Sequence, residues 1–249
     1  MGKPRVAILR SAGINCDDET VFAWNLAGAD ASLVHLDDVV AMPARVDEYD
    51  ILTLPGGFSF GDDISAGAIF ASRIGQALSD SIRRLVDRGG LVLGICNGFQ
   101  VLVKSGLLNV GDADTSCSLT INTSARFTCR WVTVSSDADH CAFLERERSY
   151  FLPIAHAEGR FVYSRWVEPA WKSVALTYSE GVDRIGPINP NGSDCDIAAI
   201  TDSTGRIMGL MPHPERYVRH TQHPFWTTLP EAAEPDGLAI FRTAVKNVG

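Results

Sequence analysis

Four short apolar runs, separated by helical segments, set the fold of the first half of the chain. They lie at residues 5–10, 31–36, 49–54 and 91–95. Continuous apolar runs of this length are typical of strands that are buried on both faces of a parallel sheet. Helical periodicity follows the first run from Asp17, fills residues 64–87, and resumes after the fourth run until Gly106. This alternation predicts an α/β fold with a mostly parallel central sheet and helices on both of its faces.

The second half of the chain has a different pattern. Residues 109–124 are small and polar and predict a loop, and the charged residues 136–149 predict a solvated surface. Candidate strands separated by Gly, Pro and Asn turns lie at 126–134, 151–157, 173–179, 197–202 and 206–211, and a closing helix is expected at 236–248. We therefore expect additional antiparallel strands on the same unit, giving a single domain over residues 1–249.

Composition narrows the classes of partner and location. The net charge of −8 argues against a nucleic-acid or anionic-membrane partner, which would favour a basic surface. No run approaches the roughly 18 consecutive apolar residues of a membrane-spanning helix. No signal region precedes the first strand, which favours a cytoplasmic location. A chain of this length without a secretion signal is expected to keep its six cysteines reduced, and their lack of paired spacing argues against a structural zinc site. We expect five of the six to be bystanders.

The sixth cysteine lies in the motif Gly94-Ile95-Cys96-Asn97-Gly98, directly after the fourth apolar run. Glycines on both sides allow a sharp strand-to-helix turn and a close approach of neighbouring elements. A thiol at such a turn is presented at the sheet edge, where the helix N-terminus favours its thiolate. The pattern is the cysteine counterpart of the nucleophile elbow of serine hydrolases. A small buried core cysteine is the alternative interpretation.

Two further turns complete a possible catalytic set. Gly56-Gly57 follows the third run, where backbone N–H groups can face an oxyanion, although a plain strand-to-helix turn has the same composition. In Met211-Pro212-His213-Pro214-Glu215 the two prolines fix the backbone around His213, and Glu215 can orient its ring. A surface histidine in a proline-rich loop is the alternative. We expect His35, His140, His220 and His223 to be surface or packing residues.

Together these parts match the requirements of thiol catalysis. A thiol nucleophile needs an imidazole to move its proton, a carboxylate to hold that imidazole, and donors for the oxyanion. Cys96, His213, Glu215 and the Gly56-Gly57 turn each lie at the end of a candidate strand. The set is more specific than any one of its members.

The same residues resemble the class I (triad) glutamine amidotransferases. The longer motifs resemble, within that family, the glutaminase subunits of phosphoribosylformylglycinamidine synthases of purine biosynthesis. These motifs are residues 55–63 (PGGFSFGDD) with 66–68 (AGA), 96–100 (CNGFQ), 156–161 (HAEGRF), 189–193 (NPNGS) and 211–216 (MPHPER). They span nearly the whole chain.

The resemblance implies a flavodoxin-like glutamine amidotransferase fold and a division of roles. Cys96 would attack the glutamine side-chain amide, His213 would shuttle the proton that expels ammonia, and Glu215 would orient His213. The backbone N–H groups of Gly57 and Asn97 would form the oxyanion hole. The resemblance implies no metal and no cofactor in this chain.

The resemblance also implies partners. Ammonia would pass to a large synthetase subunit, which in many bacteria is accompanied by a small third subunit. The synthetase would use ATP and Mg²⁺, because this chain itself shows no phosphate-binding loop. His156 and Glu158 would line the ammonia exit or the synthetase interface, although a strand-end hydrogen-bond network explains them equally well. Segments 111–125 and 218–235 look longer than in compact members. We also expect low glutaminase activity without the partner, because the Gly56-Gly57 turn must supply a donor.

Two other functions remain open at this level. A free-standing cysteine hydrolase, such as a γ-glutamyl hydrolase or a peptidase, would keep the elbow but not the transfer of ammonia. A flavodoxin-like binding subunit with a silent thiol would not react selectively at Cys96 with a glutamine-mimicking electrophile.

Overall fold

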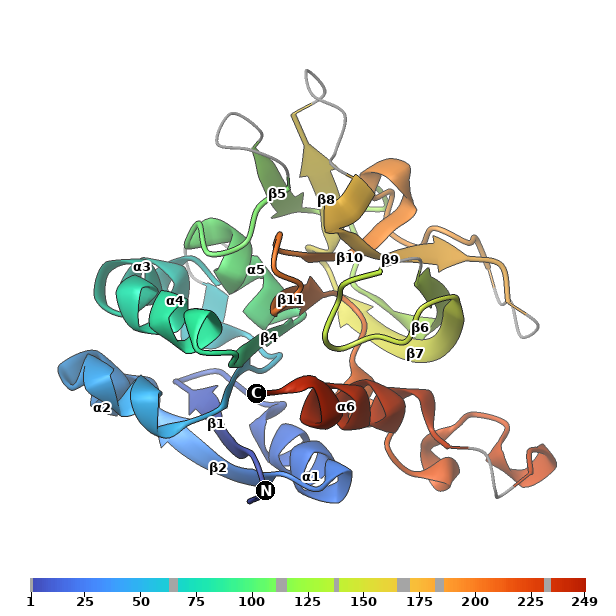
Figure 1. The fold of residues 1–249 in the computed structure, drawn as a ribbon. Helices are drawn as coiled ribbons and strands as arrows, with labels where there is room; N and C mark the ends of the chain where they lie inside the picture. Colours follow the sequence, from blue (N-terminus) through green and yellow to red (C-terminus); the bar gives the residue numbers. More distant parts are fainter. Residues whose placement is uncertain are drawn as a thin grey trace.

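One nine-stranded sheet runs through the molecule, in the order β2-β1-β3-β4-β11-β10-β9-β6-β7 (Figure 1). The computed structural model describes residues 2–62, 67–110, 116–136, 139–164, 171–181, 186–230 and 234–249. The strands of the sheet are β1 Arg5–Arg10, β2 Asp30–His35, β3 Ile51–Leu54, β4 Leu91–Ile95, β6 Thr128–Ser136, β7 Arg148–His156, β9 Val174–Ser179, β10 Ile197–Thr201 and β11 Ile207–Leu210. The four predicted apolar runs thus form β1 to β4.

The sheet has a parallel half and an antiparallel half. All pairings from β2 to β11 are parallel, and all pairings from β11 to β7 are antiparallel. This arrangement confirms the expected α/β fold of a parallel sheet extended by antiparallel strands. The direction reverses four times between β11 and β7, so β7 runs the same way as β4 and β11. The carboxyl end of β7 therefore lies at the same edge of the sheet as theirs.

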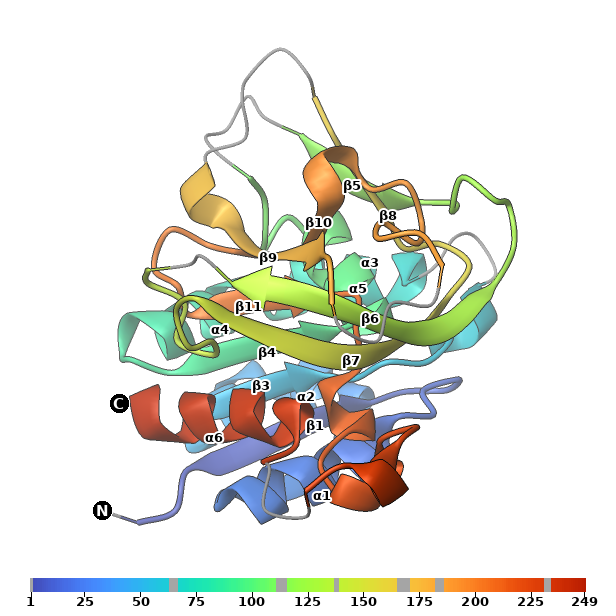
Figure 2. The same cartoon turned by 90° about the vertical axis from the view of Figure 1, so that its right-hand side faces the viewer.

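Helices cover both faces of the sheet. They are α1 Asp17–Ala27, α2 Leu36–Ala41, α3 Ala68–Ala77, α4 Ser79–Asp87, α5 Asn97–Lys104 and α6 Asp236–Asn247. Helices α1 and α6 lie side by side (Figures 1 and 2), with the rings of Trp24 and Phe241 4.8 Å apart. Trp24 also donates from Nε1 to Thr53 Oγ1 of β3 at 3.0 Å, which fixes α1 against the sheet. Helix α5 packs with α3 on the opposite face, as right-handed crossovers require.

A second, two-stranded sheet corrects one sequence prediction. Residues 109–124 were expected to form a loop, yet β5 (Cys117–Thr120) pairs antiparallel with β8 (Arg160–Tyr163). The strand is short and buries only Leu119, so its sequence carries almost no periodic signal. Residues 111–115 lie outside the described part of the chain. The small sheet rests on α5, where Phe161 stacks on Phe99 with ring centroids 6.3 Å apart.

A second prediction, of a solvated segment at 136–149, is wrong in part. Phe143 is fully buried and Leu144 is 5% exposed, so this segment covers part of the core. Asp139 and the charged residues 145–147 are exposed, and their number hides the apolar positions in the composition; residues 137–138 lie outside the described part of the chain. The helical stretch 64–87 is two helices that meet at Leu78, and residues 63–66 are outside the described part. Within the described ranges, no helix has the length and apolar character that a bilayer span requires.

Candidate active site

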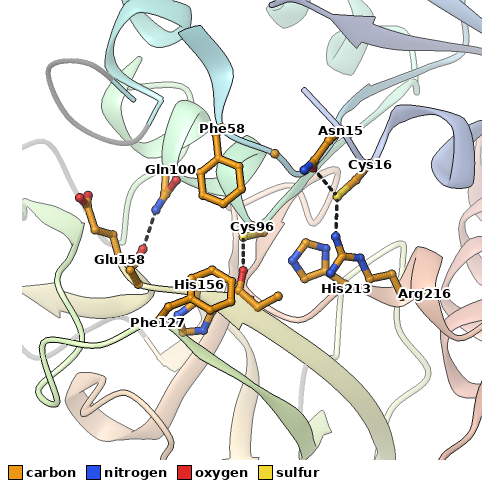
Figure 3. A pocket seen from close by; sticks show the side chains of 13 residues that line it. Asn15, Cys16, Phe58, Cys96, Gln100, Phe127, His156, Glu158, His213 and Arg216 are labelled. Atoms are coloured by element: carbon orange, nitrogen blue, oxygen red, sulfur yellow. Dashed lines mark hydrogen bonds between the residues drawn. The ribbon is translucent and has the colours of Figure 1, made fainter. Parts of the chain in front are cut away.

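Five strands bring their carboxyl ends to one edge of the sheet, where they surround a cavity of about 250 Å³ (Figure 3). The carboxyl edge of parallel strands is the usual position for ligand sites in open α/β sheets. The walls come from the loops after β1, β3 and β11, from the start of α5, and from the end of β7. The cavity is lined by Asn15, Cys16, Gly57, Phe58, Cys96, Gln100, Phe127, Ala155, His156, Ala157, Glu158, His213 and Arg216.

Cys96 occupies the turn between β4 and α5 in a backbone conformation that few residues adopt. Its φ and ψ are 51° and −103°, a region that costs on the order of 1–3 kcal/mol for a side chain with a Cβ. The turn is held because the Cys96 N–H donates to Leu210 O of β11 at 2.8 Å. Gly98 is required beside it, since a Cβ at that position would lie 1.9 Å from Leu54 O. The strained backbone aims the Cys96 thiol into the cavity.

His213 and Glu215 form a buried pair beside this thiol. His213 Nδ1 lies 2.6 Å from Glu215 Oε1, and the two residues are 1% and 0% exposed. The backbone N–H of His213 donates to Pro153 O of β7 at 2.8 Å, so the loop after β11 is tied to the far half of the sheet. Burial alone would lower the pKa of His213, but the negative charge of Glu215, together with the neighbouring Cys96 and Cys16 thiols, outweighs it. The pKa of His213 therefore lies well above its usual value.

The Gly56-Gly57 turn is shaped by its neighbours. A Cβ on Gly56 would lie 2.8 Å from His213 Cε1 and 3.2 Å from Cys16 Sγ, so only glycine leaves room for the imidazole. Gly57 has a φ of 147° and bridges to Ile14, while the adjacent Phe58 N–H donates to Gly13 O at 2.9 Å. This close packing against His213 and the loop after β1 accounts for glycine at both positions. Gly57 faces the cavity, and Asn97 begins α5 beside Cys96.

Cys16 and Arg216 are cavity residues that the sequence interpretation missed. Cys16 was expected to be one of the bystander cysteines, yet Arg216 Nη2 donates to its Sγ at 3.0 Å (Figure 3). Burial raises the pKa of the Cys16 thiol, although the neighbouring His213 opposes the shift. The order of the elements could have indicated that Cys16 lies near Cys96. Cys16 ends the loop after β1, and the carboxyl ends of β1 and β4 lie at the same edge of the sheet. The other four non-nucleophile cysteines do not line this cavity.

Three potential metal ligands lie together here. One donor atom from each of Cys16, His213 and Glu215 lies within 4.8 Å of the others. However, His213 Nδ1 and Glu215 Oε1 are already engaged with each other at 2.6 Å, which is shorter than the separation of two ligands on one zinc ion. The arrangement fits an oriented imidazole better than a metal centre.

The remaining histidines separate clearly from His213. His35 accepts from the N–H of Asp37 at the start of α2, and His223 packs among aromatic rings, which include Trp131, Phe151 and Tyr217. Both agree with the expected surface or packing roles.

His156 ends β7 and lines the cavity, with its Nδ1 3.1 Å from Asn122 Oδ1. Glu158 also lines the cavity, and its backbone O accepts from Gln100 Nε2 at 2.5 Å.

Comparisons with known proteins agree with this geometry. The sequence model of the CobB/CobQ-like glutamine amidotransferase domain matches residues 3–248. A protein of Dehalococcoides mccartyi named phosphoribosylformylglycinamidine synthase subunit PurQ is 43% identical over 250 residues, covering 99% of this chain and 98% of the relative. A protein of the same name from Methanococcus maripaludis is 39% identical and covers 98% of both chains.

A solved structure, described as the structure of PurLQS from Thermotoga maritima, superposes with a TM-score of 0.76. It is 33% identical and the match covers 98% of both chains. The family match spans nearly all of the sequence, and the fold, the strained cysteine turn and the buried histidine–glutamate pair lie within it. The chain therefore belongs to the CobB/CobQ-like glutamine amidotransferase family.

Proposed function

We propose that this chain is the glutaminase subunit of a phosphoribosylformylglycinamidine synthase. It would hydrolyse glutamine to glutamate and ammonia and deliver the ammonia to a synthetase. The observation that carries the proposal is the buried 2.6 Å bond from Glu215 to His213, which lines the same cavity as Cys96. Relatives named as PurQ subunits of that synthase, and the assembly named PurLQS, support the choice of pathway.

The first half of the proposed reaction forms a thioester. Cys96 Sγ attacks the side-chain carbonyl carbon of glutamine while His213 accepts the thiol proton. The negative charge of Glu215 stabilises the imidazolium that results, which fits the raised pKa of His213. His213 then returns the proton to the amide nitrogen, the carbon–nitrogen bond breaks, and ammonia leaves. The γ-glutamyl group stays on Cys96.

The second half releases the product. Water attacks the thioester carbonyl with His213 as the base, the carbon–sulfur bond breaks, and the proton returns to the Cys96 sulfur. In both halves the carbonyl oxygen becomes an oxyanion. We assign its donors to the backbone N–H groups of Gly57 and Asn97, because Gly57 lines the cavity and Asn97 opens a helix beside the nucleophile.

The partner would be a large synthetase subunit that uses ATP and Mg²⁺ to activate the amide of formylglycinamide ribonucleotide, together with a small third subunit. We propose a cytoplasmic location, where the free cysteines would remain reduced. We also treat residues 1–249 as one domain, since a single sheet takes strands from near both ends of the sequence.

The test is a comparison of two nitrogen sources in the reconstituted complex. In the Cys96→Ala variant, glutamine-dependent synthesis should vanish while synthesis from added ammonia continues. Cys129→Ala, which changes an exposed cysteine outside the cavity, is the matched control and should behave as wild type. If Cys96→Ala still hydrolyses glutamine, the assignment of the nucleophile is wrong.

The same experiment distinguishes the two alternative functions. A free-standing hydrolase would cleave its substrate at the same rate with or without the synthetase, and would not supply ammonia to it. A binding subunit with a silent thiol would release no glutamate under any condition. Low activity of the isolated chain that rises when the synthetase and its substrates are added would match the proposed partnership.

A further inference from the structure

The side-chain amide of Asn122 has one defined orientation. Asn122 is 2% exposed and lies just after β5. Its Nδ2 donates to the backbone oxygens of Arg126 at 3.0 Å and of His156 at 2.9 Å, which can only accept. The other atom, Oδ1, accepts from the N–H of Gly159 at 3.1 Å. A flipped amide would lose all three bonds, so Oδ1 faces His156.

This orientation fixes the proton on the His156 ring. Its Nδ1 lies 3.1 Å from Asn122 Oδ1, which can only accept, so Nδ1 carries the hydrogen. Burial, followed by the charge of His213, lowers the pKa of His156 to about 3, so the ring is neutral. A neutral imidazole with its hydrogen on Nδ1 has a bare lone pair on Nε2. Nε2 of His156 is therefore a hydrogen-bond acceptor.

The imidazole of His156 is held against Gly159. A Cβ on Gly159 would lie 2.2 Å from Nδ1 and Cε1 of His156, so the imidazole packs directly on the Gly159 backbone. Its Nε2 is buried, and no described residue forms a hydrogen bond to it. The ring lines the same cavity as Cys96 (Figure 3). A buried acceptor without a donor costs on the order of 1–3 kcal/mol, which a ligand N–H group that reaches Nε2 would recover.

We propose that His156 Nε2 accepts a hydrogen bond from the side-chain amide nitrogen of bound glutamine, and so distinguishes the amide from the acid. The inference rests on the proposed glutaminase function. With the carbonyl oxygen directed to the donors at Gly57 and Asn97, the NH₂ group points away from them, toward the wall formed by the end of β7. Ala155 O, which accepts from Cys96 Sγ at 3.8 Å, is a second acceptor on this wall.

The arrangement has consequences for both substrate and product. A glutamate carboxylate would place an oxygen lone pair against the lone pair of His156, so glutamate should bind poorly and leave after hydrolysis. In the tetrahedral intermediate, an N–H group held by His156 would direct the nitrogen lone pair elsewhere, where His213 can protonate it. His156 acts here as a specificity-determining and positioning residue, and it exchanges no proton.

The test measures glutamine and glutamate binding separately. In the complex carrying Cys96→Ala, which blocks turnover, calorimetry should show a marked preference for glutamine over glutamate. Adding His156→Phe, which keeps a planar ring on Gly159 but removes the acceptor, should lower that preference about tenfold or more, as expected for the loss of a buried hydrogen bond. Phe127→Leu, on the same cavity, is the control and should leave the ratio unchanged.

Folding and function are checked independently. Size-exclusion chromatography should show that the His156→Phe chain assembles with the synthetase as wild type does, and circular dichroism should show that it folds. In ¹⁵N-histidine NMR spectra, His156 should carry its proton on Nδ1, and its Nε2 signal should shift with glutamine but not with glutamate.

The outcomes separate the two proposals. If His156→Phe weakens both ligands equally, or the proton resides on Nε2, this inference is overturned while the glutaminase assignment stands. If the wild-type complex with intact Cys96 releases no glutamate from glutamine, the proposed function itself fails.

Discussion

His213 Nδ1 lies 2.6 Å from Glu215 Oε1, and neither residue reaches solvent. Replacing Glu215 with Gln removes the charge that supports the imidazolium but leaves a side chain of the same shape. Glutamine-dependent turnover should fall by on the order of 10³-fold, because the ring loses both its fixed tautomer and its stabilised cation. Ammonia-dependent synthesis by the complex should not change. A Glu215→Gln variant that retains a tenth or more of the glutaminase activity would contradict the role of Glu215.

The same pair predicts how stability depends on pH. The pKa of His213 is raised in the folded state above the unfolded value of about 6.5, so above that pH the folded state binds a proton that the unfolded state lacks. This contribution to the free energy of unfolding is fully present below about pH 6.5 and is lost as the pH rises through the folded pKa. Urea unfolding of wild type should therefore weaken more steeply above pH 6.5 than that of Glu215→Gln. Parallel pH profiles would show that the pair does not hold the proton.

His156 predicts the opposite trend on the acid side. Its pKa is lowered to about 3, so between about pH 6.5 and that value the folded state binds fewer protons than the unfolded state. The stability difference between wild type and His156→Phe should be largest above about pH 6.5 and shrink as the pH falls. His213, Cys96 and Glu158 line the same cavity in both proteins, so the difference isolates His156. A constant difference between pH 7 and 5 would mean that His156 titrates normally.

Gly56 offers a steric test of the imidazole position. Gly56→Ala places a Cβ 2.8 Å from His213 Cε1, and the resulting displacement of the ring should reduce turnover by about 10²-fold. Gly75→Ala is the matched control. Gly75 lies within α3, and a Cβ there would meet Ser105 O, at the end of α5, at an ordinary 3.5 Å. The Gly75→Ala variant should therefore keep full activity, and its free energy of unfolding should rise by roughly 0.5–1 kcal/mol. Equal activity of the two variants would indicate that the ring tolerates movement.

The two cavity cysteines should differ in reactivity. Cys16 is 1% exposed and burial raises the pKa of its thiol, so a chloroketone analogue of glutamine should label Cys96 alone. Peptide mass spectrometry gives the modified position directly. Labelling at Cys16, or labelling of Cys96 that glutamine does not slow, would contradict the proposed orientation of the substrate.

The parts of the fold that the sequence predicts are those with a long or uniform signal. Strand β1 and strand β4 fall on the predicted residues because each is continuously apolar and ends at a turn. β5 is missed because four residues with one buried side chain have no period to detect. Cys96, His213 and Glu215 could be found because Gly and Pro mark their turns.

The positions of other cavity residues are set by pairing between segments that are distant in the sequence. His156 reaches the site only because four reversals of strand direction bring the end of β7 to the edge where β4 ends. Cys16 reaches it through pairing of the loop after β1 with the Gly56-Gly57 turn. Neither relationship is local in the sequence, so residue type alone cannot separate these side chains from ordinary core positions.

The bond between the Cys96 N–H and Leu210 O joins positions far apart in the sequence, and it has a consequence for synthesis of the protein. A nascent chain that has emerged only as far as β9 contains the thiol but neither the base nor the strand that holds the thiol turn. Contacts between distant segments form late, after the entropy of closing a long loop has been overcome. A nascent chain should therefore be unable to consume glutamine until β11 and His213 have left the ribosome and can fold against β4.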